Sequence, residues 1–333
     1  MKGAPTLARR LAPILGLMCL VAGAQELPTI LVVDTEDWVN YGNPVVDPVQ
    51  LARNPGVVTT TPSLNFGTSV VLADVTAING SRAKGVFIFE GQQLRLTPTP
   101  NPGQAISDVT RANRVRITIE ILHPDGRQIG AILAAGLVGG TPAPGSPMGS
   151  ITDSIAITGG TGGFLGAKGT INTVEAGGRV TSQVEDPSMR RVHGGGRQRY
   201  VIQLFPMFRP EVLVGPAGPV IFHGDDWSPV TANRPASPGE GLILYAKGLG
   251  PTNPSVNPGD PFPSVQPFAL VTSPVEVLVN GRSSPAINQL GVPRTTDTYR
   301  VDFRVPDGTQ TGQAAVQLSA AWVKGAAVSI PVR

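Results

Sequence analysis

The sequence is organised around one glycine-dense stretch, residues 153–174, in which two β-like runs flank the segment TGGTGGFLG at residues 158–166. Glycines at this density can let backbone amides approach a phosphate at the start of a helix. However, residues 167–174 supply Gly169 and several β-branched side chains, and both disfavour a helix interior. The stretch therefore predicts a strand, a glycine turn and a returning strand.

The residues of this stretch and its surroundings do not fit either of two known nucleotide-binding motifs. The turn superficially resembles that of short-chain dehydrogenases, but the chain lacks the alternation of strands and amphipathic helices that a parallel nucleotide-binding sheet requires. A phosphate-binding loop needs a Gly-Lys-Ser/Thr run, whereas Lys168 lies between Ala167 and Gly169. We therefore expect no cofactor.

Residues 156–169 resemble a family motif. They read AITGGTGGFLGAKG and are similar to the GGTGxFxxAxG segment of the allene oxide cyclase/dirigent β-barrel superfamily. The resemblance implies an antiparallel, often oligomeric barrel with an apolar pocket that holds a hydrophobic substrate. The catalytic carboxylates of dirigent proteins cannot be placed in this sequence, so the activity does not transfer with the fold. The glycines expected to shape the turn are Gly159, Gly160, Gly162, Gly163, Gly166 and Gly169.

Composition and length support an all-β protein of two domains. The 333 residues include 41 glycines and 33 prolines, more than a fifth of the chain, and both residue types disfavour helix interiors. The length suits two domains of ordinary size. The strand signals of the first part suggest a closed barrel or a sandwich, and the family resemblance implies the barrel. We therefore expect an antiparallel β-barrel at residues 25–206, a linker at residues 207–219, and an immunoglobulin-like β-sandwich at residues 220–333.

Strand signals recur along the whole chain. Residues 114–122 alternate polar and apolar side chains with a period of two, as in a strand of a sheet that has one solvent-exposed face. Asn79-Gly80 and residues 124–126 are turn sequences that favour hairpins, and an irregular loop is expected after residue 33. Besides the runs beside the glycine turn, the expected strands cover residues 27–33, 69–78, 85–89, 93–97, 114–122, 128–138, 197–205, 242–246, 275–279, 299–305, 314–318 and 327–332.

The C-terminal third carries a resemblance of its own. Residues 228–232, 238–251, 274–281 and 301–306 are similar, in the same order, to an IPT/TIG-related immunoglobulin-like domain that closes secreted acidobacterial proteins. The resemblance covers residues 220–333. It implies a module that binds, spaces or displays, because such domains are seldom enzymes.

The N-terminus has the order of a secretory signal. Three basic residues precede an apolar run at residues 11–21, and the small residues 22–24 follow. The run is shorter than the roughly 20 apolar residues that span a bilayer. We expect cleavage after Ala24 and a secreted, periplasmic or cell-surface protein.

Cleavage would also remove the apparent basicity and the only cysteine. Residues 1–24 hold three of the 26 Lys and Arg residues and none of the 23 Asp and Glu residues, so the mature chain is balanced. Nucleic acid is therefore not an expected partner, since its binding needs clustered cations. Because Cys19 lies in the signal, the mature protein has no disulfide and no thiolate site.

The densest polar segment, residues 185–199, contains two acids, four arginines and one histidine. Guanidinium groups bind carboxylates through paired hydrogen bonds, so one interpretation is a site for an anionic ligand at a barrel mouth. The other, which we favour, is a solvated loop whose charges pair internally. The candidate ligand-binding residues are Arg190, Arg191, His193 and Arg197.

A second polar segment, HGDDW at residues 223–227, offers three groups that could bind a metal. No second ligand cluster stands at a recognisable spacing, so we interpret the segment as a turn and expect no metal. The chain also lacks the GxSxG and HExxH motifs, so no sequence motif indicates a hydrolase mechanism.

Together these patterns favour an exported protein without catalysis, in which the barrel is structural or holds a small apolar ligand and the C-terminal domain is an interaction module. A homo-oligomer through the barrel is compatible with this interpretation. One alternative is a dirigent-like or cyclase-like isomerase, whose mark would be an acidic or tyrosine side chain pointing into a barrel cavity. The other is a protein that binds carbohydrate or a cell surface.

Overall fold

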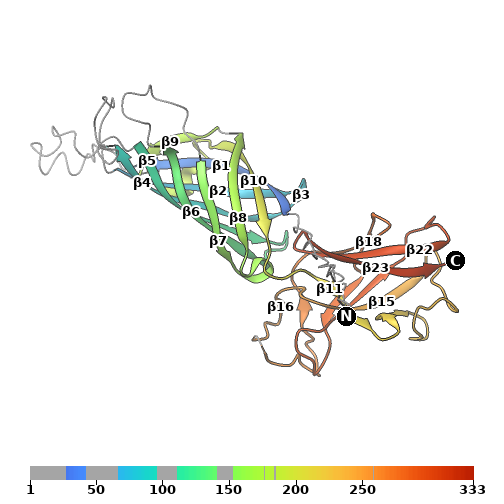
Figure 1. Cartoon of the computed structure of the whole chain (residues 1–333). Coiled ribbons are helices and arrows are strands. Elements are labelled where there is room, and N and C mark those ends of the chain that lie inside the picture. Colours follow the sequence, from blue (N-terminus) through green and yellow to red (C-terminus); the bar gives the residue numbers. More distant parts are fainter. Residues whose placement is uncertain are drawn as a thin grey trace, which may run out of the picture.

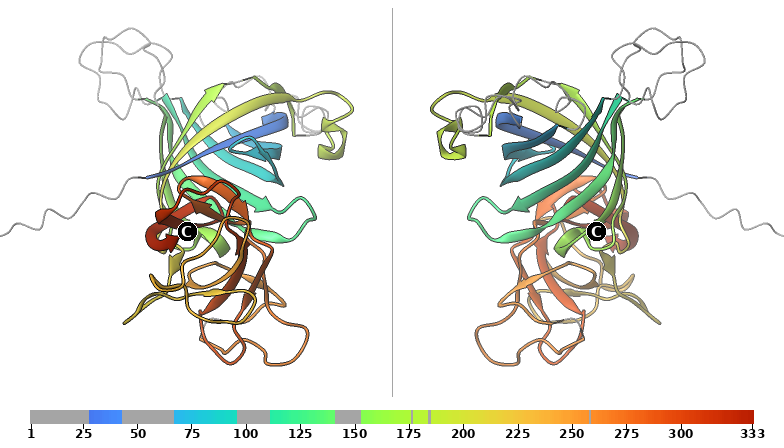
Figure 2. Two further views of the ribbon diagram at one scale, coloured as in Figure 1. Left: turned by 90° about the vertical axis from the view of Figure 1, so that its right-hand side faces the viewer. Right: turned by 90° about the vertical axis from the view of Figure 1, so that its left-hand side faces the viewer.

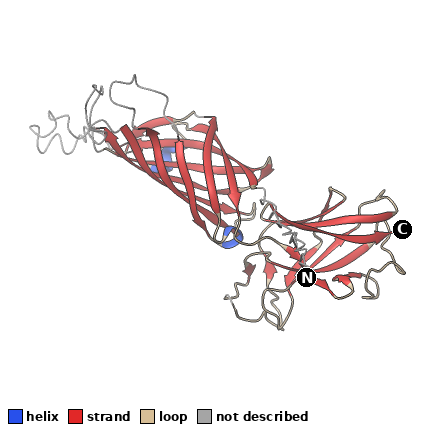
Figure 3. Ribbon diagram, viewed as in Figure 1, coloured by secondary structure: helices blue, strands red, loops and turns tan. Residues whose placement is uncertain are grey.

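The computed structural model describes residues 28–42, 67–95, 111–140, 153–175, 177–183, 185–257 and 259–333. The predicted signal peptide, with Cys19, lies outside these residues. The described regular structure is strand apart from two short 3-10 helices, η3 (Gly162–Phe164) and η4 (Pro187–Arg190) (Figure 3). In the described part of the chain, no helix has the length and apolar character to cross a membrane.

Eight antiparallel strands close into a barrel (Figure 1). They are β1 (Thr29–Gly42), β2 (Thr68–Ile78), β4 (Lys84–Arg95), β5 (Arg111–Leu122), β6 (Gln128–Gly140), β7 (Asp153–Gly160), β8 (Lys168–Glu175) and β10 (Gly196–Phe205). From β2 to β8 each of these strands pairs with the next, β8 pairs with β10, and β1 joins β10 to β2 and so completes the ring. Closure leaves the ring without a free sheet edge. Two short strands lie outside it: β3 (Ser81–Arg82) continues the β2 hairpin, and β9 (Arg179–Ser182) runs parallel to the end of β1.

The alternation predicted for residues 114–122 is confirmed in β5. Val115, Ile117, Ile119 and Ile121 are buried in the barrel core, while the residues between them are less buried. The same period holds in β10, where Tyr200 and other alternate residues point inward. Because successive side chains of a strand face opposite sides, one set fills the barrel and the other covers it.

Strand β1 is longer than the sequence predicted. It continues past Val33 through an acidic segment that we expected to be a loop, and it ends at Gly42. A β-bulge between Glu36 and Val39 adds one residue to β1 against both neighbouring strands. A bulge of this kind changes which residues face inward. Likewise, the strand expected at 85–89 and residues 93–95 of the strand expected at 93–97 are parts of the single strand β4, while residues 96 and 97 lie outside the described residues.

Beyond Phe205 the chain forms a second set of antiparallel sheets around its own core. One sheet contains β11 (Glu211–Val212), β14 (Ile221–His223), β15 (Gly241–Lys247), β16 (Thr252–Asn253), β17 (Leu270–Val271), β20 (Asn288–Gly291) and β21 (Tyr299–Arg304). The other contains β18 (Val275–Val279), β19 (Arg282–Pro285), β22 (Gly312–Ala320) and β23 (Val323–Val332). Leu244 and Phe303 of the first sheet share one buried cluster with Val277 and Leu318 of the second. The two sheets therefore form a sandwich, called the C-terminal sandwich below.

The segment expected to be a linker, residues 207–219, has strands of its own. Strand β11 pairs with β15 of the C-terminal sandwich, and β12 (Val214–Gly215) forms a small hairpin with β13 (Gly218–Pro219). The chain thus enters the sandwich within a few residues of leaving the barrel.

The glycine turn lies where the barrel meets the C-terminal sandwich (Figure 2). Phe164 of η3 is fully buried in the barrel core, and Ala321 and Val323 of the sandwich belong to the same cluster. Gly163 approaches Ala321 so closely that a Cβ at position 163 would lie 2.8 Å from the Cβ of Ala321. The turn predicted from the glycines is therefore present between β7 and β8, and it also contacts the second core.

Candidate functional site

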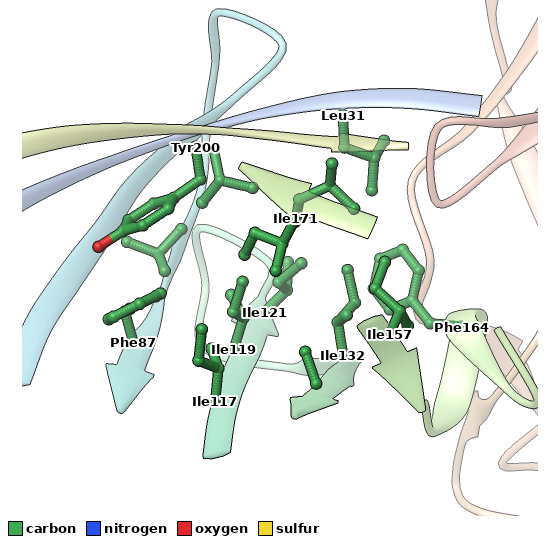
Figure 4. Packing of buried hydrophobic residues seen from close by; sticks show 14 of the residues in the cluster. Leu31, Phe87, Ile117, Ile119, Ile121, Ile132, Ile157, Phe164, Ile171 and Tyr200 are labelled. Carbon is green, nitrogen blue, oxygen red and sulfur yellow. The ribbon is translucent and has the colours of Figure 1, made fainter. Parts of the chain in front are cut away.

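The barrel is filled with apolar side chains at the end next to the C-terminal sandwich. Figure 4 shows this packing from Phe164 and Ile157 beside the sandwich to Phe87 and Tyr200 further along the barrel. The labelled side chains are between 0% and 4% exposed. The opposite end of the barrel is called the distal end below.

Three polar side chains form a hydrogen-bonded chain inside the barrel. Trp38 Nε1 donates to the hydroxyl oxygen of Tyr200 over 3.0 Å, and the Tyr200 hydroxyl donates to Gln198 Oε1 over 2.7 Å. The Tyr200 ring stacks on Phe87, with centroids 4.4 Å apart and planes 14° from parallel. The Tyr200 hydroxyl thus accepts one hydrogen bond and donates another, so it is satisfied as acceptor and as donor. This polar layer lies between the apolar interior and the distal end.

The distal end presents a buried acceptor without a partner. Asn40 follows the bulge of β1 and lies opposite Val71, whose side chain is in the barrel core, so Asn40 faces inward. Its Oδ1 is buried and has no hydrogen-bond partner among the described residues. Trp38, Phe89 and Val138 pack against the core but are only partly buried. We call Trp38, Asn40, Phe89 and Val138 the distal interior; its apolar walls and single orphaned acceptor suit an apolar ligand with one hydrogen-bond donor.

The carboxylate of Asp34 lies on the outer face of the barrel, because its neighbour Val33 faces the core. Asp34 of β1 pairs with Arg199, whose Nε lies 2.6 Å from Asp34 Oδ1, and both alternate with inward-facing residues. Tyr200 is the residue of the hydrophobic core cluster whose side chain carries a titratable group.

The predicted candidates Arg190, Arg191 and Arg197 gather on the outside of β1 and β2. Arg190 and Arg191 both pair with Asp74 of β2, and the contact from Arg191 Nη2 to Asp74 Oδ2 is 2.5 Å. Arg197 Nη2 lies 3.1 Å from Glu36 Oε1. The three guanidinium groups therefore face carboxylates of the barrel wall, as expected for charges that pair within the molecule.

The fourth candidate, His193, belongs to a group centred on Glu185. Arg179 donates to both oxygens of Glu185, over 2.6 Å and 2.8 Å, and the Thr181 hydroxyl donates over 2.7 Å. His193 Nδ1 lies 3.4 Å from Glu185 Oε1. These hydrogen bonds, chiefly those from Arg179, lower the pKa of Glu185 to about 2. The group joins β9 to the residues on either side of η4.

The segment at residues 223–227 forms a turn after β14, as the sequence predicted. The structure also brings Glu240 to this turn, with Glu240 Oε1 only 2.5 Å from His223 Nδ1. Sequence reasoning missed Glu240 because it lies 17 residues further along the chain. It missed the distal interior for a different reason, since the bulge in β1 has no signature in the residue pattern.

Comparisons of this chain with protein-family models, with curated proteins and with solved structures give no match.

Proposed function

We propose that this chain is an exported, non-catalytic binding protein whose barrel holds a small, mainly apolar ligand in the distal interior. The observation that carries the proposal is the orphaned Oδ1 of Asn40. A buried acceptor without a partner costs about 1–3 kcal/mol, and a ligand that donates one hydrogen bond would remove this cost. Export is supported by the charged, apolar and small-residue order of residues 1–24.

We further propose distant kinship for both parts of the chain. For the barrel, the support for membership in the allene oxide cyclase/dirigent superfamily is the glycine motif at the turn between two antiparallel strands of a closed barrel. For the C-terminal sandwich, the ordered motifs at residues 228–306 support an IPT/TIG-like immunoglobulin domain. Such a domain would act as the interaction module.

Binding can be tested with N-phenyl-1-naphthylamine, a neutral apolar fluorophore with one N–H donor. We expect the full mature chain to enhance its emission saturably, with one site. Val138→Phe should weaken binding at least about tenfold by filling the distal interior. The control Val174→Phe places the same ring on the outer side of β8, where Val174 is 59% exposed, and should leave binding unchanged. Unsaturable binding, or equal effects of both variants, would contradict the proposal and favour a purely structural barrel.

The orphaned acceptor gives a second, sharper prediction. Asn40→Leu removes a buried polar group that has no partner, so it should raise the free energy of unfolding of the ligand-free protein by about 1 kcal/mol or more. The same change should weaken binding of the fluorophore. Urea unfolding and fluorescence titration measure the two effects, and a variant that is both less stable and unchanged in binding would count against a ligand role for Asn40.

A second candidate function is a dirigent-like or cyclase-like isomerase, and the inward-facing Tyr200 favours it. Its hydroxyl is already hydrogen-bonded to Trp38 and Gln198, and its ring packs on Phe87. Access of a substrate to Tyr200 would require these contacts to open, which makes binding the better-supported function. The isomerase would become the better-supported function if the mature chain converted a cyclisable or radical-derived hydrophobic substrate and Tyr200→Phe lost this activity.

A further inference from the structure

One cluster in the C-terminal sandwich carries metal-binding groups from two separate segments. His223 ends β14, Asp225 lies in the turn that follows, and Glu240 immediately precedes β15. One imidazole nitrogen and one oxygen from each carboxylate lie within 4.8 Å of one another. All three residues line a polar cleft of about 720 Å³.

The two ring nitrogens of His223 have different surroundings. The side chain is 2% exposed, and its Nε2 lies 3.2 Å from the carbonyl oxygen of Arg234. A carbonyl can only accept, so Nε2 carries a proton. Nδ1 then faces Glu240 Oε1 at 2.5 Å, and two acceptors come this close only with a proton between them. This proton is the one that a metal ion would replace. A histidine that binds a metal characteristically donates its other ring N–H to such a carbonyl.

Glu240 and Asp225 complete the cluster from different sides. Glu240 Oε2 accepts a hydrogen bond of 2.8 Å from the backbone N–H of Ser237, which holds Oε1 towards His223 and the cleft. Asp225 is 70% exposed and borders the cleft on the solvent side. Hydrogen bonds thus hold His223 through Nε2 and Glu240 through Oε2, while Glu240 Oε1 and the exposed Asp225 can adjust to a ligand.

Two arginines of the cleft must be considered as competitors for these carboxylates. Arg234 forms its closer ion pair with Asp226, and its contact with Asp225 is longer, at 3.5 Å between Nη2 and Oδ2. Arg333 donates through Nε to the hydroxyl of Ser237 over 2.9 Å. Neither guanidinium forms an ion pair with Glu240 among the described residues, so Asp225 and Glu240 keep carboxylate oxygens for a cation.

We propose that His223, Asp225 and Glu240 bind a divalent first-row transition metal ion, with zinc preferred. One nitrogen and two carboxylate oxygens suit Zn²⁺, and a water molecule would complete a tetrahedron. Mg²⁺ and Ca²⁺ favour sites made of oxygen alone. Metal–ligand bonds of about 2.0–2.2 Å put two tetrahedral ligand atoms roughly 3.4 Å apart. Glu240 Oε1 therefore moves about 1 Å into the cleft when the ion replaces the proton.

The bound ion ties the turn after β14 to the start of β15. These segments are already joined by a backbone hydrogen bond from Gly224 N to Gly241 O, 2.9 Å long. A ligand that binds only the folded chain stabilises it by mass action. The metal is thus a structural clamp of the C-terminal sandwich.

The test uses isothermal calorimetry and thermal unfolding of the full mature chain with ZnCl₂, with MgCl₂ for comparison. Asp225→Asn and Asp226→Asn remove the same charge from the same turn, but only Asp225 belongs to the cluster. We expect Asp225→Asn to weaken zinc binding by about tenfold or more, and Asp226→Asn by less than about threefold. Glu240→Gln should also lose zinc affinity, and circular dichroism would verify that each variant is folded.

Two other histidines lie beside carboxylates and could bind zinc on their own. His123 Nδ1 is 3.0 Å from Asp125, and His193 is near Glu185. The titration is therefore repeated in the double variant H123Q/H193Q, which should keep one zinc site and its rise in unfolding temperature. Absence of zinc binding in this variant, or equal losses in Asp225→Asn and Asp226→Asn, would overturn the proposal.

Discussion

At the scale of single residues, the glycines of the turn have different physical roles. Gly169 has φ of +145°, and a Cβ there would lie 1.8 Å from the carbonyl oxygen of Gln203 on β10. Gly159 has no atom within 4 Å of its hypothetical Cβ. The sequence groups both in one motif, although only the first is required by close strand pairing.

Substitution by alanine should separate these two glycines. Gly169→Ala forces β8 away from β10, and we expect the free energy of unfolding to fall by at least about 2 kcal/mol. Gly159→Ala should change it by less than about 0.5 kcal/mol. Urea unfolding of both variants measures the difference, and similar losses at the two positions would contradict the assigned roles.

At the scale of elements, backbone pairing of β9 with β1 and several ion pairs hold the β9–η4 segment to the barrel wall. Arg179 bonds to Glu185 within the segment, and Arg190 pairs with Asp74 of β2. Exposed ion pairs contribute little individually, but several of them fix the position of an irregular segment. The segment buries the outer side of β1, where Tyr41 is only 3% exposed.

Acid should loosen this segment before the barrel core. Because Glu185 has its pKa lowered from 4.5 to about 2 in the folded chain, its contribution to stability is complete above pH 4.5 and disappears as the pH falls towards 2. We expect hydrogen-exchange protection of the β9 amides to fall over this range. In Glu185→Gln the protection should already be low above pH 4.5, and a variant that keeps the same acid-dependent loss would contradict the role of Glu185.

At the scale of the whole molecule, the barrel and the C-terminal sandwich share buried surface. Ala321 and Val323 of the sandwich belong to the barrel core cluster, and Trp322 packs against it. Unfolding of the sandwich would therefore expose apolar surface of the barrel, which couples the stability of the two parts.

A charge at this contact should uncouple them. Ala321→Glu buries a carboxylate without a partner, which costs several kcal/mol unless the contact opens. We expect one calorimetric transition in the unmodified mature chain and two in this variant, with a larger radius of gyration in solution scattering. Ala315→Glu, at an exposed position of β22, is the matched control. If Ala321→Glu also unfolds in one transition, the two parts are not coupled through this contact.

The amino-acid sequence by itself determined the local features of this protein. The period-two runs, the Asn79-Gly80 hairpin and the strand–turn–strand form of residues 153–174 were predicted correctly, because each depends on neighbours within a few residues. The order of strands and turns was enough to predict an all-β chain, but it left a barrel and a sandwich open for the first part, and the barrel was expected from the resemblance of the glycine motif.

Only the tertiary structure decided which side chains meet. Trp38 reaches Tyr200 across 162 positions because strand pairing closes the barrel and a bulge turns Trp38 inward. Asp74 meets Arg190 across 116 positions, and Glu240 meets His223 once β14 and β15 pair. An alternating sequence pattern shows which residues of a strand share a face of the sheet. Register, bulges and closure of the barrel decide which face is inside and which residues lie opposite one another.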